Sequence, residues 1–161
     1  MEQKYLKSKL LYAPNKGVFY WIDPPMGHSN LLGEEAGCIR NGVKKYHSIQ
    51  IDGVKYKRSR LAFLYMMGSW PPDCIDHING NSLDDRWQNL RAATIMQNNW
   101  NIKVRSKRSD LPMGVRINAN GKYSARIGVN KKQIQIGTFD TPAQAHKAYL
   151  TAREKYFGQF A

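Results

Sequence analysis

The chain has 161 residues, of which 42% are hydrophobic and 23% are charged, and its formal net charge is +13. This length and apolar content allow one or two small folded domains and exclude an intrinsically disordered chain. No run of about 18 apolar residues is present to span a membrane, and the N-terminal segment lacks the apolar stretch of a secretory signal. The two cysteines, Cys38 and Cys74, are too few for a disulfide framework, and there is no CxxC pair to suggest a zinc ribbon.

The positive charge is concentrated in the second half of the sequence. Residues 86–161 contain 14 Lys and Arg against three acidic residues, whereas residues 1–85 contain 11 against nine. Basic proteins bind nucleic acids by releasing the cations condensed on the phosphate backbone, so this excess favours a nucleic-acid partner. The alternative is a solvated basic surface that has no such partner.

The first 57 residues are predicted to be rich in β-structure. Residues 17–22 (GVFYWI) have the composition of a strand, and Asp52-Gly53 separates two alternating runs, which is typical of a hairpin with a type I′ turn. Residues 58–68 are predicted to form a helix, with Leu61 and Leu64 on one face and Gly68 at its end. The apolar side chains of this helix are expected to form part of a core.

Residues 73–102 are predicted to form a strand, a long polar loop, a second strand and a helix. A short apolar run surrounds Ile75, the loop INGNSLDDRWQN follows, and LRAA forms the second strand. Thr94 and Gln97 make a T-x-x-Q capping box, so the helix is expected to begin at Thr94 and to continue through Asn98 and Trp100.

Asp76 and His77 stand at the end of the first of these strands, immediately before the polar loop. Metal-assisted phosphodiester hydrolysis needs a divalent ion to neutralise charge on the phosphate and a base to deprotonate water. A carboxylate suits the ion, and an imidazole that titrates near neutrality suits the base. Because Mg²⁺ takes oxygen ligands, including amide carbonyls, an Asn on the facing helix can complete such a site.

Residues 76–101 (DHINGNSLDDRWQNLRAATIMQNNWN) resemble the ββα-metal core of HNH endonucleases, especially the homing type encoded by phages and introns. The family pattern is D-H-x-x-G-N, then N-L-R, then a His or Asn on the helix. This resemblance implies that His77 is the general base and that Asp76 and Asn98 bind one divalent metal ion, Mg²⁺ or alternatively Mn²⁺. It also implies that Asn89 braces the loop so that the imidazole is correctly aimed. The similarity extends upstream through GVFYWI, the Asp-Gly hairpin and RLAFLYMMGSWPP, which implies an HNH nuclease domain over residues 1–102.

The sequence departs from the family at two positions. Asn98 stands where many HNH enzymes have His, and Asn99 or Asn101 remains an alternative ligand if the helix register differs. Ser59 stands where related sequences often carry His.

Other residues around the motif have two interpretations each. Arg86 and Arg91 border the site and would hold phosphates beside the scissile bond, or they are merely solvated. Trp87 and Trp100 are predicted to pack in a core and not to stack on bases. The remaining histidines are expected to be surface or hydrogen-bonded residues: His28, His47 and His146.

Residues 103–110 (KVRSKRSD) are predicted to be a basic linker, because they show no apolar periodicity. Its positive side chains are expected to follow the phosphate backbone or a minor groove, with a solvated tether as the alternative. They are Lys103, Arg105, Lys107 and Arg108.

Residues 111–161 are predicted to form a three-stranded antiparallel sheet packed on one helix. Apolar and polar residues alternate through residues 122–128 and again through 133–136, so one face is apolar and the other is polar and basic. Thr141 and Gln144 form a second capping box around Pro142, and the helix that follows carries an apolar stripe ending at Tyr156.

This segment resembles the DNA-binding domain of the Apetala-two or ethylene-response-factor type, through GVR, KYSARI and GTFDT before an Ala-rich helix. In that family the sheet lies in the major groove and the helix supports it. Asn118 and Asn120 stand where the family commonly has Arg and Trp, so its base preference is not transferred. Arg suits guanine and Gln suits adenine in the major groove. The side chains expected to contact DNA are Arg116, Lys122, Arg126, Gln133 and Gln135.

The sequence therefore predicts an α+β protein, with an N-terminal β-hairpin region and ββα-metal (His-Me finger) core followed by a three-stranded sheet on one helix. We expect a monomeric, metal-dependent endonuclease that acts on double-stranded DNA, with sequence preference supplied by residues 111–161. A DNA-binding regulator with a vestigial HNH core and an RNA-binding or RNA-cleaving protein are the alternatives. The expected location is inside the cell, in the cytoplasm of a bacterial host if a phage encodes the chain, with no membrane and no small-molecule cofactor.

Overall fold

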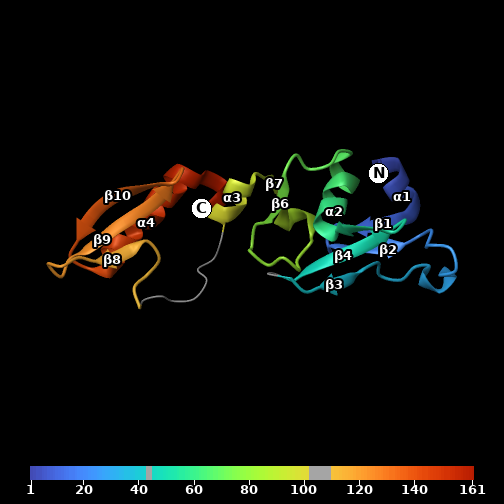
Figure 1. Cartoon of the computed structure of the whole chain (residues 1–161), viewed down its shortest axis with the longest axis horizontal. Helices are drawn as coiled ribbons and strands as arrows, with labels where there is room; N and C mark the ends of the chain where they lie inside the picture. The colour runs from blue at the N-terminus through green and yellow to red at the C-terminus, as the bar shows by residue number, and fades with distance from the viewer. Residues whose placement is uncertain (43–44, 102–109) are drawn as a thin grey trace. The chain divides into compact units, whose positions relative to one another are not determined.

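The computed structural model describes residues 1–42, 45–101 and 110–161, drawn in colour in Figure 1. Several small antiparallel sheets and a few helices confirm the predicted α+β class. The chain divides into two compact units, residues 1–98 and residues 99–161. The four basic residues of the predicted linker lie outside the described residues: Lys103, Arg105, Lys107 and Arg108. Within the described part of the chain, no helix is both long and apolar enough to cross a membrane.

The first unit contains three small antiparallel sheets (Figure 1): β1 pairs with β2, β4 lies between β3 and β5, and β6 pairs with β7. The predicted strand at residues 17–22 is β2, and the predicted Asp52-Gly53 hairpin joins β4 to β5. Both turn residues have positive φ, 49° and 78°, as a type I′ turn requires. The elements of this unit are α1 (Gln3–Lys9), β1 (Leu10–Ala13), β2 (Val18–Trp21), β3 (Cys38–Arg40), β4 (Tyr46–Ile51), β5 (Val54–Lys57), α2 (Arg58–Met67), β6 (Cys74–His77) and β7 (Leu90–Ala93).

One hydrophobic core joins these elements. Leu6 of α1, Phe19 of β2, Ile49 of β4 and Leu61 of α2 are fully buried in it. Leu90 of β7 belongs to the same core, so the β6–β7 pair is attached to the N-terminal sheets through apolar packing. The predicted helix at residues 58–68 is α2, and it ends at Gly68 in the left-handed conformation.

The second unit is a three-stranded sheet with one helix packed on it, as predicted (Figure 1). Strand β9 (Tyr123–Val129) lies between β8 (Val115–Ile117) and β10 (Lys132–Phe139). Helix α4 (Pro142–Phe157) begins with the predicted capping box, in which Thr141 and Gln144 bond to each other's backbone amide groups.

The apolar face of α4 differs from the prediction at its C-terminal end. Tyr156 is exposed, and Phe157 is the buried residue there. The Phe157 ring stacks on Trp100 with 4.6 Å between ring centroids, and Arg153 Nη2 donates to the Trp100 carbonyl oxygen at 2.9 Å. Trp100, predicted to pack in a core, is half-buried and stacks on a residue of α4.

Candidate active site

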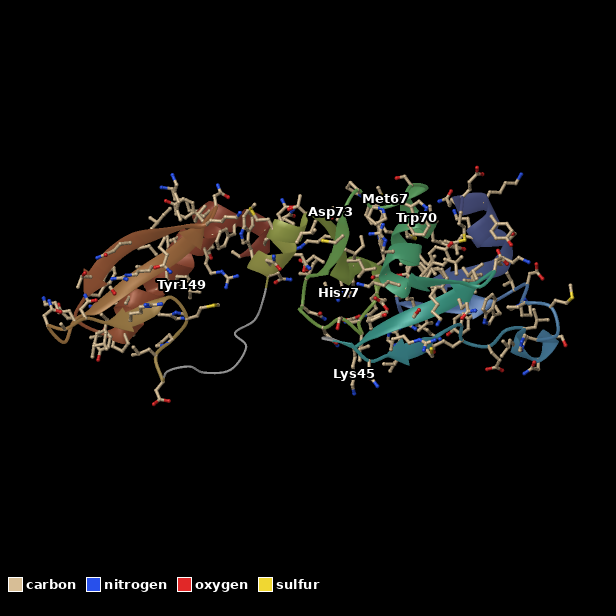
Figure 2. All side chains as sticks on the ribbon, viewed as in Figure 1. Lys45, Met67, Trp70, Asp73, His77 and Tyr149 are labelled. Carbon is tan, nitrogen blue, oxygen red and sulfur yellow. The ribbon has the colours of Figure 1, made fainter. Side chains whose placement is uncertain are left out.

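The D-H-x-x-G-N motif begins at the end of β6, beside β7. The register pairs Asp76 with Arg91 and His77 with Leu90. The Ile78 amide donates to the Asn89 carbonyl oxygen at 2.9 Å, so residues 78–89 form a closed loop between the two strands. His77, labelled in Figure 2, lies where β6 leads into this loop.

Asn89 is buried, and its side chain makes three hydrogen bonds within the loop. Its Oδ1 accepts the Asn79 amide at 3.0 Å, and its Nδ2 donates to Asn79 Oδ1 at 3.1 Å and to the Asp84 carbonyl oxygen at 2.7 Å. These are the contacts that a residue bracing the loop requires, because they join its first and second halves.

The two arginines that border the motif both form ion pairs. Arg86 binds both carboxylate oxygens of Asp84, at 2.7 and 2.6 Å, and these hydrogen bonds lower the pKa of Asp84 to about 2. Arg91 Nε and Nη2 lie 2.7 and 2.6 Å from Asp76 Oδ2. The Arg86 side chain is 44% exposed, whereas the Arg91 side chain is 14% exposed and pairs with the buried Asp76.

Asp85 is the residue on which the loop and the N-terminal sheets converge. Its side chain is only 2% exposed. Oδ1 lies 3.0 Å from His77 Nε2, Oδ2 accepts Arg58 Nε at 2.9 Å, and the Asp85 carbonyl oxygen accepts the Tyr12 hydroxyl at 2.6 Å. The sequence analysis did not identify Asp85 or Arg58 as site residues. Their partners are separated by up to 73 residues along the chain, so local sequence patterns carry no signal for them.

His47, on β4, completes this cluster. Arg58 Nη2 lies 2.7 Å from His47 Nδ1, and because a guanidinium only donates, Nδ1 must accept. Burial and the charge of Arg58 lower the pKa of His47. His47 Nδ1 also lies 3.2 Å from Asp85 Oδ2, so His47 is a hydrogen-bonded histidine, within the predicted description. Arg58 Nη1 also binds Glu35 Oε1 at 2.7 Å.

The β1–β2 hairpin presses directly against Asp85. Gly17, in the turn between these strands, has a φ of 73°, and a Cβ atom there would lie 2.4 Å from the Arg86 backbone nitrogen and 2.5 Å from the Asp85 carbonyl carbon. The Trp87 amide donates to the Pro14 carbonyl oxygen at 3.0 Å. Trp87 also packs against the core, as predicted.

We predict that Gly17→Ala destabilises the first unit by about 2–4 kcal/mol, because the methyl group overlaps backbone atoms and the left-handed conformation is strained. Urea unfolding of the full chain measures the loss. Gly53→Ala is the matched control: Gly53 has a similar φ of 78°, but a Cβ atom there meets nothing within 4 Å. That variant is expected to lose about 1–2 kcal/mol. Equal losses in both variants would contradict the close packing of Gly17 on the loop.

The two predicted metal ligands lie on different elements, a strand and a helix. Asp76 is buried on β6, and Asn98 is half-buried on α3 (Ile95–Trp100). The capping box that begins α3 is present as predicted, since Thr94 and Gln97 exchange hydrogen bonds of 2.8 and 3.1 Å. Asn99, an alternative ligand, lies on the same helix, and Asn101, the other alternative, follows that helix.

Throughout residues 1–42, 45–101 and 110–161, no group of three or more His, Cys, Asp or Glu side chains is placed to hold a metal ion. The predicted pair of one carboxylate and one amide carbonyl is not such a group. It offers only oxygen ligands, which fit a hard divalent ion that takes its other ligands from water and phosphate.

The predicted DNA-contacting residues of the second unit share one face of its sheet. Arg116 is opposite Ser124, and Arg126 is opposite Gln135, while Ala125 and Ile127 alternate onto the buried face toward α4. Lys122 and Gln133 follow the same alternation as Arg126 and Gln135. Arg126 is half-buried. The other four residues are exposed: Arg116, Lys122, Gln133 and Gln135.

Comparisons with known proteins agree with the motif. Residues 56–100 match a family model described as HNH endonuclease. The chain is 32% identical over 120 residues to a protein of Acanthamoeba polyphaga mimivirus that is named an uncharacterized HNH endonuclease, over 73% of this chain and 62% of that protein. The chain thus spans about 62% of the length of this relative. No solved structure matches the chain significantly. Residues 56–100, which contain the loop after His77, are therefore similar to the HNH endonuclease family.

Proposed function

We propose that this protein is a metal-dependent endonuclease that hydrolyses phosphodiester bonds of double-stranded DNA. The observation that carries the proposal is the position of His77, which lies beside Asp76 at the start of the HNH loop and is held by a buried carboxylate. The net charge of +13 suits a polyphosphate substrate.

In this proposal each motif residue has one task. His77 accepts the proton of the attacking water. Asp76 and Asn98 would hold one divalent ion, Mg²⁺ or Mn²⁺, which would supply positive charge to the scissile phosphate and the leaving oxygen. Asn89 keeps the loop closed through its bonds to Asn79 and Asp84. Since one chain contributes one such centre, a monomer cuts one strand per encounter.

Metal-dependent relaxation of supercoiled plasmid tests the proposed activity. The full chain is incubated with Mg²⁺, with Mn²⁺, or with excess EDTA, and nicked and linear products are separated on a gel. Nicking with either ion and no nicking in EDTA is the expected result. Binding to the plasmid without cleavage under any divalent ion would instead support a DNA-binding regulator with a vestigial HNH core.

The polar face of the C-terminal sheet is proposed to read the DNA sequence in the major groove, in the manner of Apetala-two domains. The support for this is the shared face of Arg116, Arg126 and Gln135 and the packing of α4 on the other side. The basic residues of 103–110 are proposed to contact the phosphate backbone between the nuclease and reader segments.

We predict that Arg116→Ala relaxes sequence preference. A bidentate arginine contact with guanine contributes about 1–3 kcal/mol of discrimination, so the preference for the selected site is expected to fall about 10- to 100-fold. Sequencing of the ends cleaved from a library of random duplexes measures the preference. Lys147→Ala is the matched control, because Lys147 is exposed on α4 and carries the same charge. An unchanged preference in Arg116→Ala would remove Arg116 from the reader role.

A further inference from the structure

We infer that the outer face of the β3–β4–β5 sheet binds the phosphate backbone of double-stranded DNA beside the nuclease loop. The cations of this surface, which we call the basic sheet face, are Arg40, Lys55 and Lys57. The inference rests on the proposed DNA substrate, but it concerns binding, which can be measured without cleavage. Nothing in the family match or in the relative's name assigns a role to these residues.

The strand register places the three cations on one side of the sheet. Residues opposite each other in an antiparallel pair point to the same face, and successive residues alternate between faces. Each cation is opposite one of three alternate residues of β4: Arg40 opposite Tyr46, Lys57 opposite Ser48, and Lys55 opposite Gln50. Ile49 and Ile51 point to the opposite face and are buried in the core, so the cations are on the outer face.

The spacing of the cations suits a DNA strand. Alternate residues of a strand are about 7 Å apart, so the three cations extend over about 14 Å along the sheet. One DNA strand carries a phosphate for about every 3.4 Å of helix axis, so about four phosphates pass over that length. Each cation can therefore contact a separate phosphate.

The positive charge of the basic sheet face is not balanced by carboxylates. All three cations are exposed, and none of them forms an ion pair with any residue that the structure describes. Lys57 Nζ instead lies 5.2 Å from the centre of the Tyr46 ring. The β4–β5 turn carries one acid, Asp52, whose Oδ2 accepts the Tyr5 hydroxyl at 2.7 Å. The uncompensated charge of the face attracts a polyanion.

Two hollows follow the same face of the sheet. Their volumes are about 340 and 540 Å³. Both are lined by Arg40, Ser48 and Lys55, so they form one continuous groove across the cations. The lining also includes Tyr46 and Gln50, and side chains of these polar types donate hydrogen bonds to phosphate oxygens.

One end of the sheet lies next to the nuclease loop, residues 78–89. Lys45, labelled in Figure 2, directly precedes β4, and its carbonyl oxygen accepts the Ser82 hydroxyl of the loop at 2.6 Å. Arg40 and Tyr46 are the pair at this end of the sheet. A DNA strand that follows the basic sheet face therefore reaches the loop that begins after His77.

A protein partner fits this surface less well than DNA does. Protein interfaces are depleted in lysine and depend on buried aromatic and apolar side chains. Two of the three cations are lysines, which bind phosphate as point charges. Beyond the half-buried Tyr46, the paired positions of this face, all among the described residues, hold no aromatic or aliphatic side chain.

Lys55→Gln combined with Lys57→Gln tests the surface in the full chain. DNA affinity is titrated in EDTA, which prevents metal-dependent cleavage, at several salt concentrations and on two duplexes of unrelated sequence. The steepness of log affinity against log salt should fall by about 2, because each lost phosphate contact removes about 0.9. Affinity at low salt should fall at least about tenfold, by the same factor on both duplexes, because phosphate contacts carry no sequence information. Adding Arg40→Gln should bring the total fall in steepness to about 3.

Lys4→Gln combined with Lys7→Gln is the matched control. Both lysines are exposed on α1 of the same unit, so the same charge is removed from a helix instead of the sheet, and the salt dependence should stay that of the wild type. A second measurement needs no variant: lysines of the wild-type protein are acetylated with and without DNA and identified by mass spectrometry. Bound DNA should protect Lys55 and Lys57 and leave Lys4 and Lys7 reactive.

The outcomes separate this inference from the proposed function. Equal salt dependence in the two double variants, or Lys55 and Lys57 that stay reactive on bound DNA, overturns the basic sheet face even if the protein cleaves DNA. Reduced salt dependence with protected lysines in a protein that cleaves nothing supports the surface and overturns the nuclease proposal. Protection by polyglutamate and not by DNA would show an acidic protein partner and refute the inference. If the double variant does not fold, acetylation of the wild-type protein alone decides.

Discussion

Replacing His77 with alanine is expected to lower the rate of DNA cleavage by about 10²- to 10⁴-fold, the contribution typical of a positioned general base. DNA affinity should stay nearly unchanged, because the basic side chains that bind phosphate are not altered. The substitution removes the imidazole from Asp85 Oδ1 but leaves the Arg58–Asp85 ion pair in place, so the first unit should remain folded.

The measurement is single-turnover cleavage of supercoiled plasmid at saturating protein, together with a binding titration in EDTA. His28→Ala is the control, since His28 is exposed and lies in the segment between β2 and β3. Cleavage by the His77 variant at the rate of the control would show that another group acts as the base, or that the nicking comes from a contaminant.

Replacing Arg58 with methionine is expected to destabilise the first unit by about 3–5 kcal/mol, because the buried carboxylate of Asp85 loses its countercharge. The Arg58 side chain is only 4% exposed and binds Asp85, Glu35 and His47. Methionine restores most of the lost volume, so the loss reports the unpaired charge more than a cavity.

Hydrogen exchange and urea unfolding over residues 1–98 measure the loss in Arg58→Met. Arg60→Met, on the same helix, is the matched control: Arg60 binds the Asp73 carbonyl oxygen at 2.6 Å and lies over the Trp70 ring. Its removal should cost about 1 kcal/mol. Equal losses of stability in the two variants would contradict the claim that Arg58 balances the buried charge of Asp85.

The features that the sequence predicts well have short-range causes. The Asp52-Gly53 turn and both capping boxes each depend on residues within four positions of one another, and all are present. The alternation of apolar and polar residues likewise predicts the C-terminal sheet, because strand geometry repeats every two residues. The D-H-x-x-G-N run also has a local cause: a short apolar strand is followed directly by a polar loop, so His77 lies at the strand end.

The features that it does not predict depend on packing between distant segments. Helix α1 is short and buries one residue, Leu6, so it has no apolar periodicity to detect. Of the adjacent acids in the loop, Asp84 binds Arg86 two residues away, whereas Asp85 turns toward Tyr12, His47 and Arg58. Which of the two turns inward is decided by side chains that only the folded sheets bring near.

The contact between the β1–β2 turn and the loop limits how short a folded fragment around the motif can be. The family match begins at Tyr56, but Tyr12, Gly17 and His47 all come earlier in the chain. A fragment trimmed to the matched residues would keep the whole motif. It would lose the segments that contact Asp85. Transfer of the matched segment into another protein therefore requires residues 1–98, which form one compact unit.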